Sequence, residues 1–208
     1  MSTMTETLEH EEALFIPSEN GETDYVPKVA GEYLGHITDA STITREFTKK
    51  GRKHKARIFN FKVHVAQENS RNTYTYTRDG ETRTVSGEHY VDLHFMANGV
   101  FRYLEPSDSD TFESNSGENK RYMMFCESLG LEIKTEERTV NGKTARVQIL
   151  PDVKEDDLNG TPVIAVVGRG DDWVNDEGKT VPSFRVKYTK RWEDGKRLAT
   201  TTTDDLPF

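Results

Sequence analysis

The segment from Ala56 to Ala66 carries the clearest structural signal in the chain. Phe59, Phe61, Val63 and Val65 fall on one side of an extended backbone, and the polar residues between them fall on the other. A period of two is typical of a strand with one buried and one solvated face. The segment therefore predicts a half-buried β-strand, with its phenylalanines and valines in a core.

Four other segments show strand-like patterns. The first, residues 30–43, contains interior glycines of the kind that mark a bulge or a sharp bend. Residues 160–168 form the most apolar run in the chain and are expected to be a central strand. The remaining two are residues 90–96 and residues 183–192. We therefore expect five principal strands and a mostly β fold.

Within the last of these strands, Phe184, Val186 and Tyr188 alternate with charged or polar residues and are expected to point inward. Asn98-Gly99 is expected to turn the third strand toward Val100–Leu104. Two polar hairpins are predicted as projecting arms, one centred on Asp79-Gly80 and one on Asn141-Gly142. These dipeptides suit turns that need positive φ.

One helix is predicted. Tyr122, Phe125, Cys126 and Leu129 have helical spacing, and Gly130 stands where a C-terminal glycine cap is expected. Cys126 lies on the apolar side of this helix, so we expect it to be a buried structural thiol.

The overall charge of −8 is unevenly distributed. Residues 1–27 hold seven acidic residues and no Lys or Arg, whereas residues 28–103 hold thirteen basic residues against eight acids. We expect an acidic flexible segment over 1–27, a folded domain with hairpin insertions over 28–195, and a flexible linker with an acidic tip over 196–208. No apolar run approaches the length of a membrane span, and no signal peptide is recognised. The chain is therefore expected to be cytoplasmic, in the host cell if it is encoded by a phage.

A dense group of cations marks a candidate phosphate-binding element. Seven basic residues fall within thirteen positions, and only Glu46 opposes them. They are Arg45, Lys49, Lys50, Arg52, Lys53, Lys55 and Arg57. Because this stretch lacks an apolar period and contains Gly51, we expect a basic loop. Like charges so closely spaced repel one another unless an anion relieves them, which favours phosphate as the ligand.

Further candidates fit contact with an unpaired nucleic acid strand, which requires cations for phosphates and flat rings for stacking bases. The cationic candidates are Lys62, Arg169, Arg185, Lys187 and Arg191. The aromatic candidates are Phe47, Tyr74, Tyr76, Phe101, Tyr103, Trp173 and Trp192. Trp173 is the foremost of these, since it is expected in a loop where burial is not forced. Phe59, Phe61, Phe95 and Phe184 are assigned to the core.

Catalytic chemistry finds little support in the sequence. The histidines are scattered, no motif of a zinc hydrolase or a nucleotide-binding loop is present, and the only cysteine is expected to be buried. Two acidic groups, residues 152–157 and 171–176, leave a metal-dependent nuclease as a weak alternative. We expect no enzyme activity, no cofactor and no bound metal.

The last residues, Asp204-Asp205-Leu206-Pro207-Phe208, place acidic groups around an apolar chain end. Such an end suits a pocket with a greasy base and a basic rim. It resembles the acidic tip of bacterial single-stranded DNA-binding proteins, which typically reads Asp-Asp-Asp-Ile-Pro-Phe, and is similar to tails of their bacteriophage counterparts.

The resemblance implies a five-stranded oligonucleotide-binding (OB) barrel with one helix and long hairpin extensions. It also implies that the protein coats and protects single-stranded DNA during replication, recombination and repair, with little sequence preference, and recruits partner proteins through residues 204–208. The tetrameric state of the family cannot be carried over, so homo-oligomerisation stays open. A different class of function is a protein-recruiting or virion-associated β module, in which the basic stretch meets an acidic protein.

Overall fold

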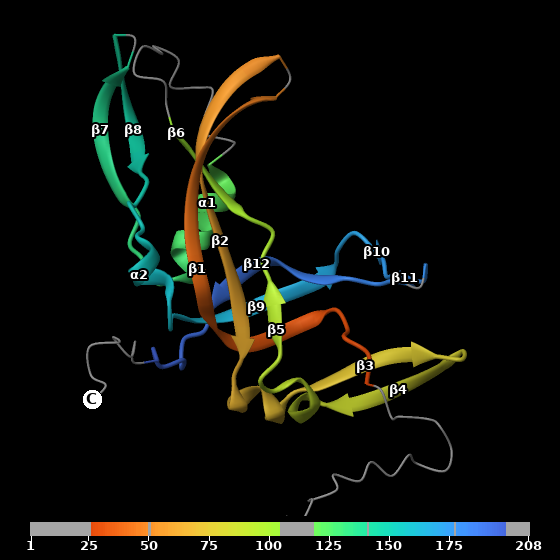
Figure 1. Ribbon diagram of the computed structural model, residues 1–208. Helices are drawn as coiled ribbons and strands as arrows, with labels where there is room; N and C mark the ends of the chain where they lie inside the picture. The colour runs from red at the N-terminus through yellow and green to blue at the C-terminus, as the bar shows by residue number, and fades with distance from the viewer. Residues whose placement is uncertain (1–25, 50, 105–118, 141, 177, 199–208) are drawn as a thin grey trace, which may run out of the picture.

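One twisted antiparallel sheet forms the body of the protein (Figure 1). This computed structural model describes residues 26–49, 51–104, 119–140, 142–176 and 178–198. The strands lie in the order β12, β9, β1, β2 and β5, and β6 also pairs with β2. Their bounds are β1 Gly31–Lys49, β2 Arg52–Val65, β5 His94–Met96, β6 Val100–Leu104, β9 Pro162–Arg169 and β12 Phe184–Arg191. The expectation of a mostly β chain is confirmed, and β9, predicted as a central strand, is an interior strand paired with β12 and β1.

The segments β5 and β6 lie along the same partner strand. Met96 pairs with Lys62, and Val100 pairs with Phe59 further along β2. The chain keeps its direction between them, so the turn predicted at Asn98-Gly99 is wrong. A Cβ atom on Gly99 would lie 2.6 Å from Cγ2 of Ile58. Glycine is therefore needed there for close approach to β2 and not for a reversal.

One isolated β-bridge joins the two ends of the strand order within the described residues. Ala97, between β5 and β6, forms an isolated parallel bridge with Val186 of β12. The N–H of Asn98 also donates to the carbonyl of Val186 at 3.4 Å. Within the described residues this bridge is isolated, so no continuous hydrogen-bonded ladder closes the sheet into a barrel.

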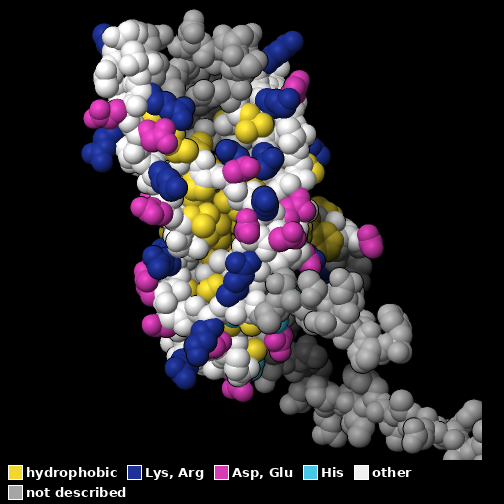
Figure 2. Space-filling view, turned by 90° about the vertical axis from the view of Figure 1, so that its left-hand side faces the viewer, with side chains coloured by type: hydrophobic (Ala, Val, Ile, Leu, Met, Phe, Trp, Pro, Cys, Tyr) yellow, Lys and Arg dark blue, Asp and Glu magenta, His cyan; other side chains and the backbone are white. Residues whose placement is uncertain are grey.

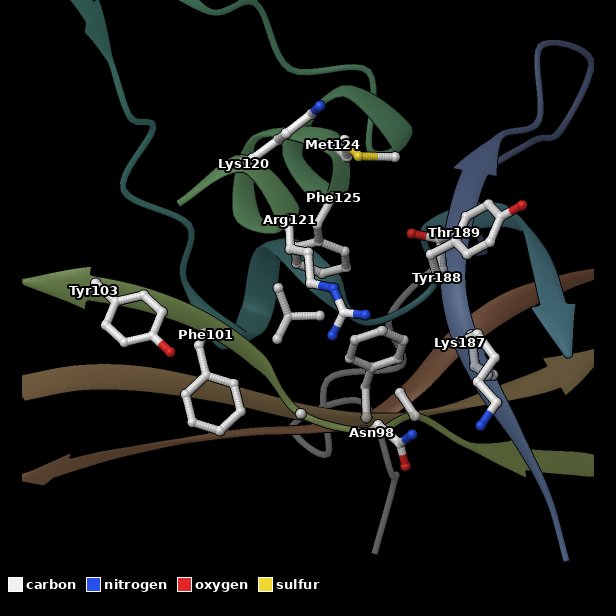
Figure 3. A pocket seen from close by; sticks show the side chains of 15 residues that line it. Asn98, Phe101, Tyr103, Lys120, Arg121, Met124, Phe125, Lys187, Tyr188 and Thr189 are labelled. Carbon is white, nitrogen blue, oxygen red and sulfur yellow. The ribbon is translucent and has the colours of Figure 1, made fainter. Parts of the chain in front are cut away.

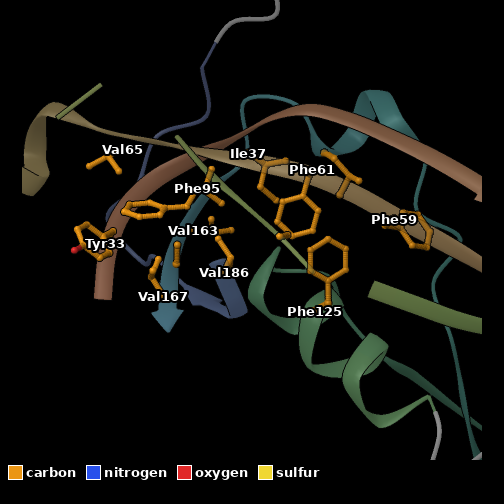
Figure 4. Packing of buried hydrophobic residues seen from close by; sticks show 14 of the residues in the cluster. Tyr33, Ile37, Phe59, Phe61, Val65, Phe95, Phe125, Val163, Val167 and Val186 are labelled. Carbon is orange, nitrogen blue, oxygen red and sulfur yellow. The ribbon is translucent and has the colours of Figure 1, made fainter. Parts of the chain in front are cut away.

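The core lies between the sheet and the helix α1, Lys120–Ser128 (Figure 4). The Phe59 ring stacks on Tyr122 with centroids 5.4 Å apart, and Phe61 stacks on Phe125 at 5.3 Å. All four side chains are at most 4% exposed. The predicted inward face of β2 is therefore confirmed. Burying one such ring contributes about 1.5–3 kcal/mol.

The predicted helix is confirmed as α1. Cys126 is buried within it, and Gly130 follows with φ +77°, a conformation that favours glycine. The hydroxyls of Ser128 and Thr189 lie 2.6 Å apart and link the end of α1 to β12. A second, short helix, α2 (Glu155–Leu158), was not predicted. Its N-terminus is marked by Asp157, whose carboxylate accepts a hydrogen bond from the Lys154 N–H.

Three two-stranded arms project from the body (Figure 1). They are β3 with β4, β7 with β8, and β10 with β11. Positive φ values at Asp79 (54°) and Gly80 (81°) confirm the first predicted turn. The second predicted hairpin is also confirmed, with Gly142 at φ +74° and Val147 buried. The bounds are β3 Thr73–Arg78, β4 Glu81–Ser86, β7 Lys134–Val140, β8 Lys143–Ile149, β10 Trp173–Val174 and β11 Thr180–Val181.

The third predicted strand is shorter than residues 90–96. Tyr90 instead ends a 3-10 turn, η2 (Gly87–Tyr90), and a second such turn, η1 (Gln67–Arg71), follows β2. Asp92 has φ +64°, which interrupts extended backbone. The phenol of Tyr90 donates to the carbonyl of Pro27 at 2.9 Å. The apolar pattern correctly indicated that Tyr90 is buried, but Tyr90 is buried from a 3-10 turn and not from a strand.

A bulge in β12 overturns the predicted alternation. Val186 pairs with Val167, but Tyr188 pairs with Val166, so the register shifts by one residue at Lys187. Beyond the bulge the two faces are exchanged. Thr189 is consequently buried, and Tyr188, predicted to point inward, is 47% exposed.

No helix in the described part of the chain is long and apolar enough to cross a membrane.

Candidate nucleic-acid interface

The predicted basic loop is instead the end of a long hairpin. The ladder between β1 and β2 continues to the pair Lys49–Arg52, and Gly51 makes the turn with φ +75°. Cross-strand hydrogen bonding thus overrode the polar, aperiodic sequence. Because neighbouring residues of a strand point to opposite faces, the cations cannot form one continuous cluster.

We call the face of β1, β2 and β6 opposite α1 the outer face. Phe59 and Phe61 point toward α1, so the residues that alternate with them belong to the outer face. Arg45 pairs with Ala56, which pairs in turn with Tyr103, and all three share this face.

Four rings gather on the outer face, and we call them the aromatic row: Phe47, His54, Phe101 and Tyr103. Phe47 and His54 lie 5.8 Å apart across the hairpin, and Phe101 and Tyr103 are stacked at 6.1 Å along β6. Phe47 meets the rings of Phe101 and Tyr103 edge-on, each at 6.1 Å. All four are half-buried. Each ring is thus held by its neighbours yet keeps part of its surface open to solvent.

The predicted basic residues divide between the two faces. Arg45 is exposed on the outer face beside the aromatic row. Lys53, Lys55 and Arg57 alternate onto the opposite face. Of these, Lys55 lies 3.5 Å from Glu46, and Arg57 donates to Asp152 at 3.0 Å. Arg102 of β6 donates to the same carboxylate.

Lys49 and Arg52 pair across the hairpin end, and Lys50 lies outside the described residues. Lys62, further along β2, sits 2.8 Å from Asp39, and the hydrogen bond from Lys62 lowers the pKa of that carboxyl. Lys62 is therefore already held by an acid of the protein itself.

Next to the aromatic row, a groove of about 1020 Å³ opens between β6, α1 and β12 (Figure 3). Phe101 and Tyr103 form one wall, Tyr188 and Lys187 lie on the opposite wall, and α1 closes the third side. The remaining lining residues are Phe61, Ala97, Asn98, Gly99, Val100, Lys120, Arg121, Met124, Phe125, Val186 and Thr189.

The sequence analysis did not identify five residues of this region: His54, Lys120, Arg121, Met124 and Tyr188. The Lys120-Arg121 pair directly before the apolar residues of the predicted helix was a usable signal for a basic helix start. Tyr188 could not be found, because the bulge that exposes it leaves no mark in the alternating pattern.

Other predicted cations lie at the outer rim of the sheet. The stems of Arg185 and Lys187 lie over Gly170 and Gly168 at the end of β9, where any larger residue would meet them. Arg191 lies 3.4 Å from Glu193. Arg169 forms two hydrogen bonds with Asp172, at 3.2 and 2.6 Å, and these raise the pKa of the guanidinium. Arg169 is thus neutralised by its neighbour.

The remaining predicted aromatics differ in accessibility. Trp173 is 54% exposed on the β10–β11 arm, in a short strand instead of the expected loop. Trp192 is half-buried with its ring 5.5 Å from that of His36. Tyr76 is also half-buried and packs on the core.

The prediction that Tyr74 stacks on a base is wrong. It is 6% exposed, stacks on Tyr33 at 4.5 Å, and donates its phenol hydrogen to Asn69 at 2.7 Å. The arm β3–β4 has an apolar side after all, formed by Tyr74 opposite Val85, so this ring cannot stack a base.

Charge on the side that carries β7, β8 and α2 is of mixed sign. Basic and acidic side chains are interspersed around a strip of hydrophobic side chains (Figure 2). Mixed charges give little net attraction for a polyanion. The outer face and the groove are therefore the better candidates.

Chemistry at reactive side chains gains no support from the geometry. No group of three or more His, Cys, Asp or Glu among the described residues is arranged to hold a metal ion. Burial raises the pKa of the Cys126 thiol to about 11, so the thiolate form is disfavoured at neutral pH.

Comparisons with known protein families, with curated proteins and with solved structures each found no match to this chain. The partner-binding tip predicted at Asp204, Asp205, Leu206, Pro207 and Phe208 lies outside the described residues.

Proposed function

We propose that this protein binds single-stranded DNA on the outer face of β1, β2 and β6. The observation that carries the proposal is the aromatic row, in which each of four partly exposed rings from three neighbouring strands lies about 6 Å from at least two of the others. Unpaired bases stack on such rings whatever their identity, and each stack contributes about 1–3 kcal/mol. The aromatic row can therefore bind single-stranded DNA with little preference for base sequence.

Cations beside the row supply the phosphate contacts. Arg45 is exposed on the same face, and Lys120 is exposed at the start of α1 beside the groove. Among the described residues, no acidic side chain forms an ion pair with these two. An incoming phosphate thus displaces no salt bridge in the described structure, whereas contact with Arg57 or Lys62 competes with Asp152 or Asp39.

The proposed architecture is an OB-type barrel with hairpin extensions. Three features support it: the strand order β12-β9-β1-β2-β5, the position of α1 in the chain after β6 and before β9, and the parallel bridge from Ala97 to Val186. In this arrangement β5 and β6 together act as the third strand of the barrel. The bridge from Ala97 to Val186 marks where this third strand meets the last strand, β12.

The proposed biological role is to coat and protect single strands during replication, recombination and repair, as in the bacteriophage proteins that the acidic tip resembles. Residues 204–208 recruit partner proteins in this proposal, and the protein performs no chemistry. Protection arises because bound strand is removed from the pool that can pair or be degraded.

A titration tests the proposal directly. Fluorescein-labelled oligothymidine is added to the protein at two salt concentrations, and anisotropy reports binding. We expect binding that weakens steeply with salt, because phosphate contacts release counterions, and weak binding to a duplex of the same length. Equal affinity for duplex and single strand, or no binding to oligothymidine, would overturn the proposal.

A second candidate rests on the β10–β11 arm. Trp173 and Val174 are 54% and 65% exposed, an arrangement suited to contact with another protein. A protein-recruiting β module would bind such a partner with little dependence on salt and would ignore oligothymidine. The nuclease alternative has no described group of metal-binding side chains in its favour.

A further inference from the structure

The groove between β6, α1 and β12 differs in character from the aromatic row that it adjoins. The row presents flat rings on an open surface, whereas the groove is recessed and has walls on three sides (Figure 3). Phe101 and Tyr103 belong to both. A strand that stacks on the row therefore reaches the groove without leaving the protein surface.

The lining favours a base over a phosphate as the occupant. Phe61, Val100 and Phe125 contribute apolar surface, and Tyr188 adds a ring opposite β6. Placing a phosphate against apolar side chains costs desolvation energy, while a base has two apolar faces. A volume of about 1020 Å³ is at the upper end of small-molecule sites, so a nucleobase with part of its sugar fits.

Polar side chains also line this space, and Arg121 lies nearest its centre (Figure 3). Arg121 projects from α1 toward the gap between β6 and β12, with Phe101 on one side and Tyr188 on the other (Figure 3). It is exposed, and within the described residues no carboxylate engages it. Lys120 and Lys187 lie on the helix and strand that flank the gap.

Arginine recognises one base edge better than the others. Its planar fork donates two parallel hydrogen bonds, which match O6 and N7 of guanine. On this same edge of the base, adenine offers a donor beside N7, cytosine offers only a donor, and thymine offers one acceptor beside a methyl group. A lone arginine in a recess with aromatic walls is thus suited to select guanine.

We propose that the groove holds one unstacked guanine of the bound strand and that Arg121 reads its O6 and N7 atoms. This inference rests on the proposed binding of single-stranded DNA and adds a sequence preference to it. The aromatic row then supplies general affinity, and the groove adds a preference at one position.

The test uses the full chain and four oligothymidines of equal length that carry dG, dA, dC or 7-deaza-dG at one central position. Competition against labelled oligothymidine gives relative affinities. We expect the dG oligonucleotide to bind on the order of 5- to 150-fold more tightly than oligothymidine. The 7-deaza-dG oligonucleotide lacks N7 and should lose most of that gain.

Variants separate the reading of a base from simple charge. Arg121→Lys keeps the positive charge but removes the fork, so we expect the preference for dG to fall below about twofold while affinity for oligothymidine is kept. Lys120→Gln is the matched control and should lower all affinities together while keeping the preference. Since both residues are exposed on α1, neither change removes core packing.

The outcomes distinguish the two proposals. Oligothymidine binding with no dG preference, or a preference that survives in Arg121→Lys, overturns the guanine site alone. A uniform loss of affinity for all four oligonucleotides in Arg121→Lys would mean that Arg121 contacts a phosphate and would also overturn it. Absence of binding to every oligonucleotide would overturn the proposed function itself.

Discussion

Asn119 and Tyr103 hold each other through a pair of hydrogen bonds. The N–H of Tyr103 donates to Oδ1 of Asn119 at 2.8 Å, and Nδ2 of Asn119 donates to the carbonyl of Tyr103 at 3.2 Å. Asn119 is 6% exposed and directly precedes α1, while Tyr103 belongs to the aromatic row. One side chain thus fixes the start of the helix against β6, beside the groove.

Asn119→Ala should destabilise the protein. The change leaves the partly buried N–H and carbonyl of Tyr103 without their partner, which costs about 1–3 kcal/mol in the free energy of unfolding. Thermal denaturation should show the midpoint falling by several degrees. Asn98→Ala, at an exposed asparagine of the same groove, is the control and should change stability by less than about 0.5 kcal/mol. An unchanged midpoint in Asn119→Ala would show that these hydrogen bonds add nothing to the fold.

Arg45→Gln should flatten the salt dependence of DNA binding. If Arg45 contacts one phosphate, its removal lowers the slope of log K against log salt by about 0.7 for a single strand. Lys55→Gln removes the same charge from the opposite face of the hairpin, where Lys55 already lies near Glu46. It should leave the slope nearly unchanged. Equal effects from the two variants would argue against an interface confined to the outer face.

Phe47→Leu should weaken binding to oligothymidine on the order of 5- to 150-fold, because leucine fills space but offers no flat ring for a base. Phe47→Tyr keeps the ring and should bind within about twofold of the original protein, since a phenol presents the same stacking face. Anisotropy titrations at one salt concentration compare the three. If Phe47→Leu binds oligothymidine as tightly as Phe47→Tyr, then no base stacks on residue 47.

Alkaline pH should destabilise the protein through its buried phenols. Burial raises the pKa of Tyr33 and Tyr122 well above the ordinary 10.0, and that of Tyr90 to about 12. The unfolded chain therefore loses these protons first as pH rises. Stability should be complete below about pH 10 and should fall progressively above it.

Urea denaturation at a series of pH values measures this effect. Tyr122→Phe should show a shallower decline between about pH 10 and pH 12, since one group with a raised pKa is gone. Tyr188→Phe removes an exposed phenol and serves as the control, with the original slope expected. A decline of the same steepness in all three proteins would place the cause elsewhere.

Deletion of residues 204–208 should leave affinity for single-stranded DNA equal or higher, because the deletion removes negative charge that repels phosphate. Partner recruitment should be lost. Binding titrations and pull-down with purified replication proteins measure the two properties. Weaker DNA binding after deletion would contradict the assigned role of the tip.

Much of the fold follows from local patterns in the chain. The alternation around Phe59 and Phe61 correctly predicts the buried face of β2, and the apolar spacing from Tyr122 to Gly130 correctly predicts α1. These signals succeed because each reflects burial on one side of one element, a property that neighbouring residues determine.

Features set by pairing between distant segments escaped prediction. The basic stretch forms strands because Thr48 pairs with Lys53 across the hairpin, although neither residue lies in a segment with a strong strand pattern. Tyr188 is exposed because β12 inserts one extra residue opposite β9. Tyr74 is buried by its stacking on Tyr33, far away in sequence. The candidate site was therefore predicted in its residue types, while its division between two faces and the groove beside it required the structure.

The strand β2 carries core phenylalanines on one side and ring-bearing neighbours on the other. Its amide hydrogens lie in ladders to β1 and to β6 between these two layers. Any molecule that grips the outer layer must slow the opening motions that let solvent deuterium reach those amides. Binding of a ligand to the outer face should therefore slow hydrogen–deuterium exchange at backbone amides in the middle of β2, including amides that do not contact the ligand.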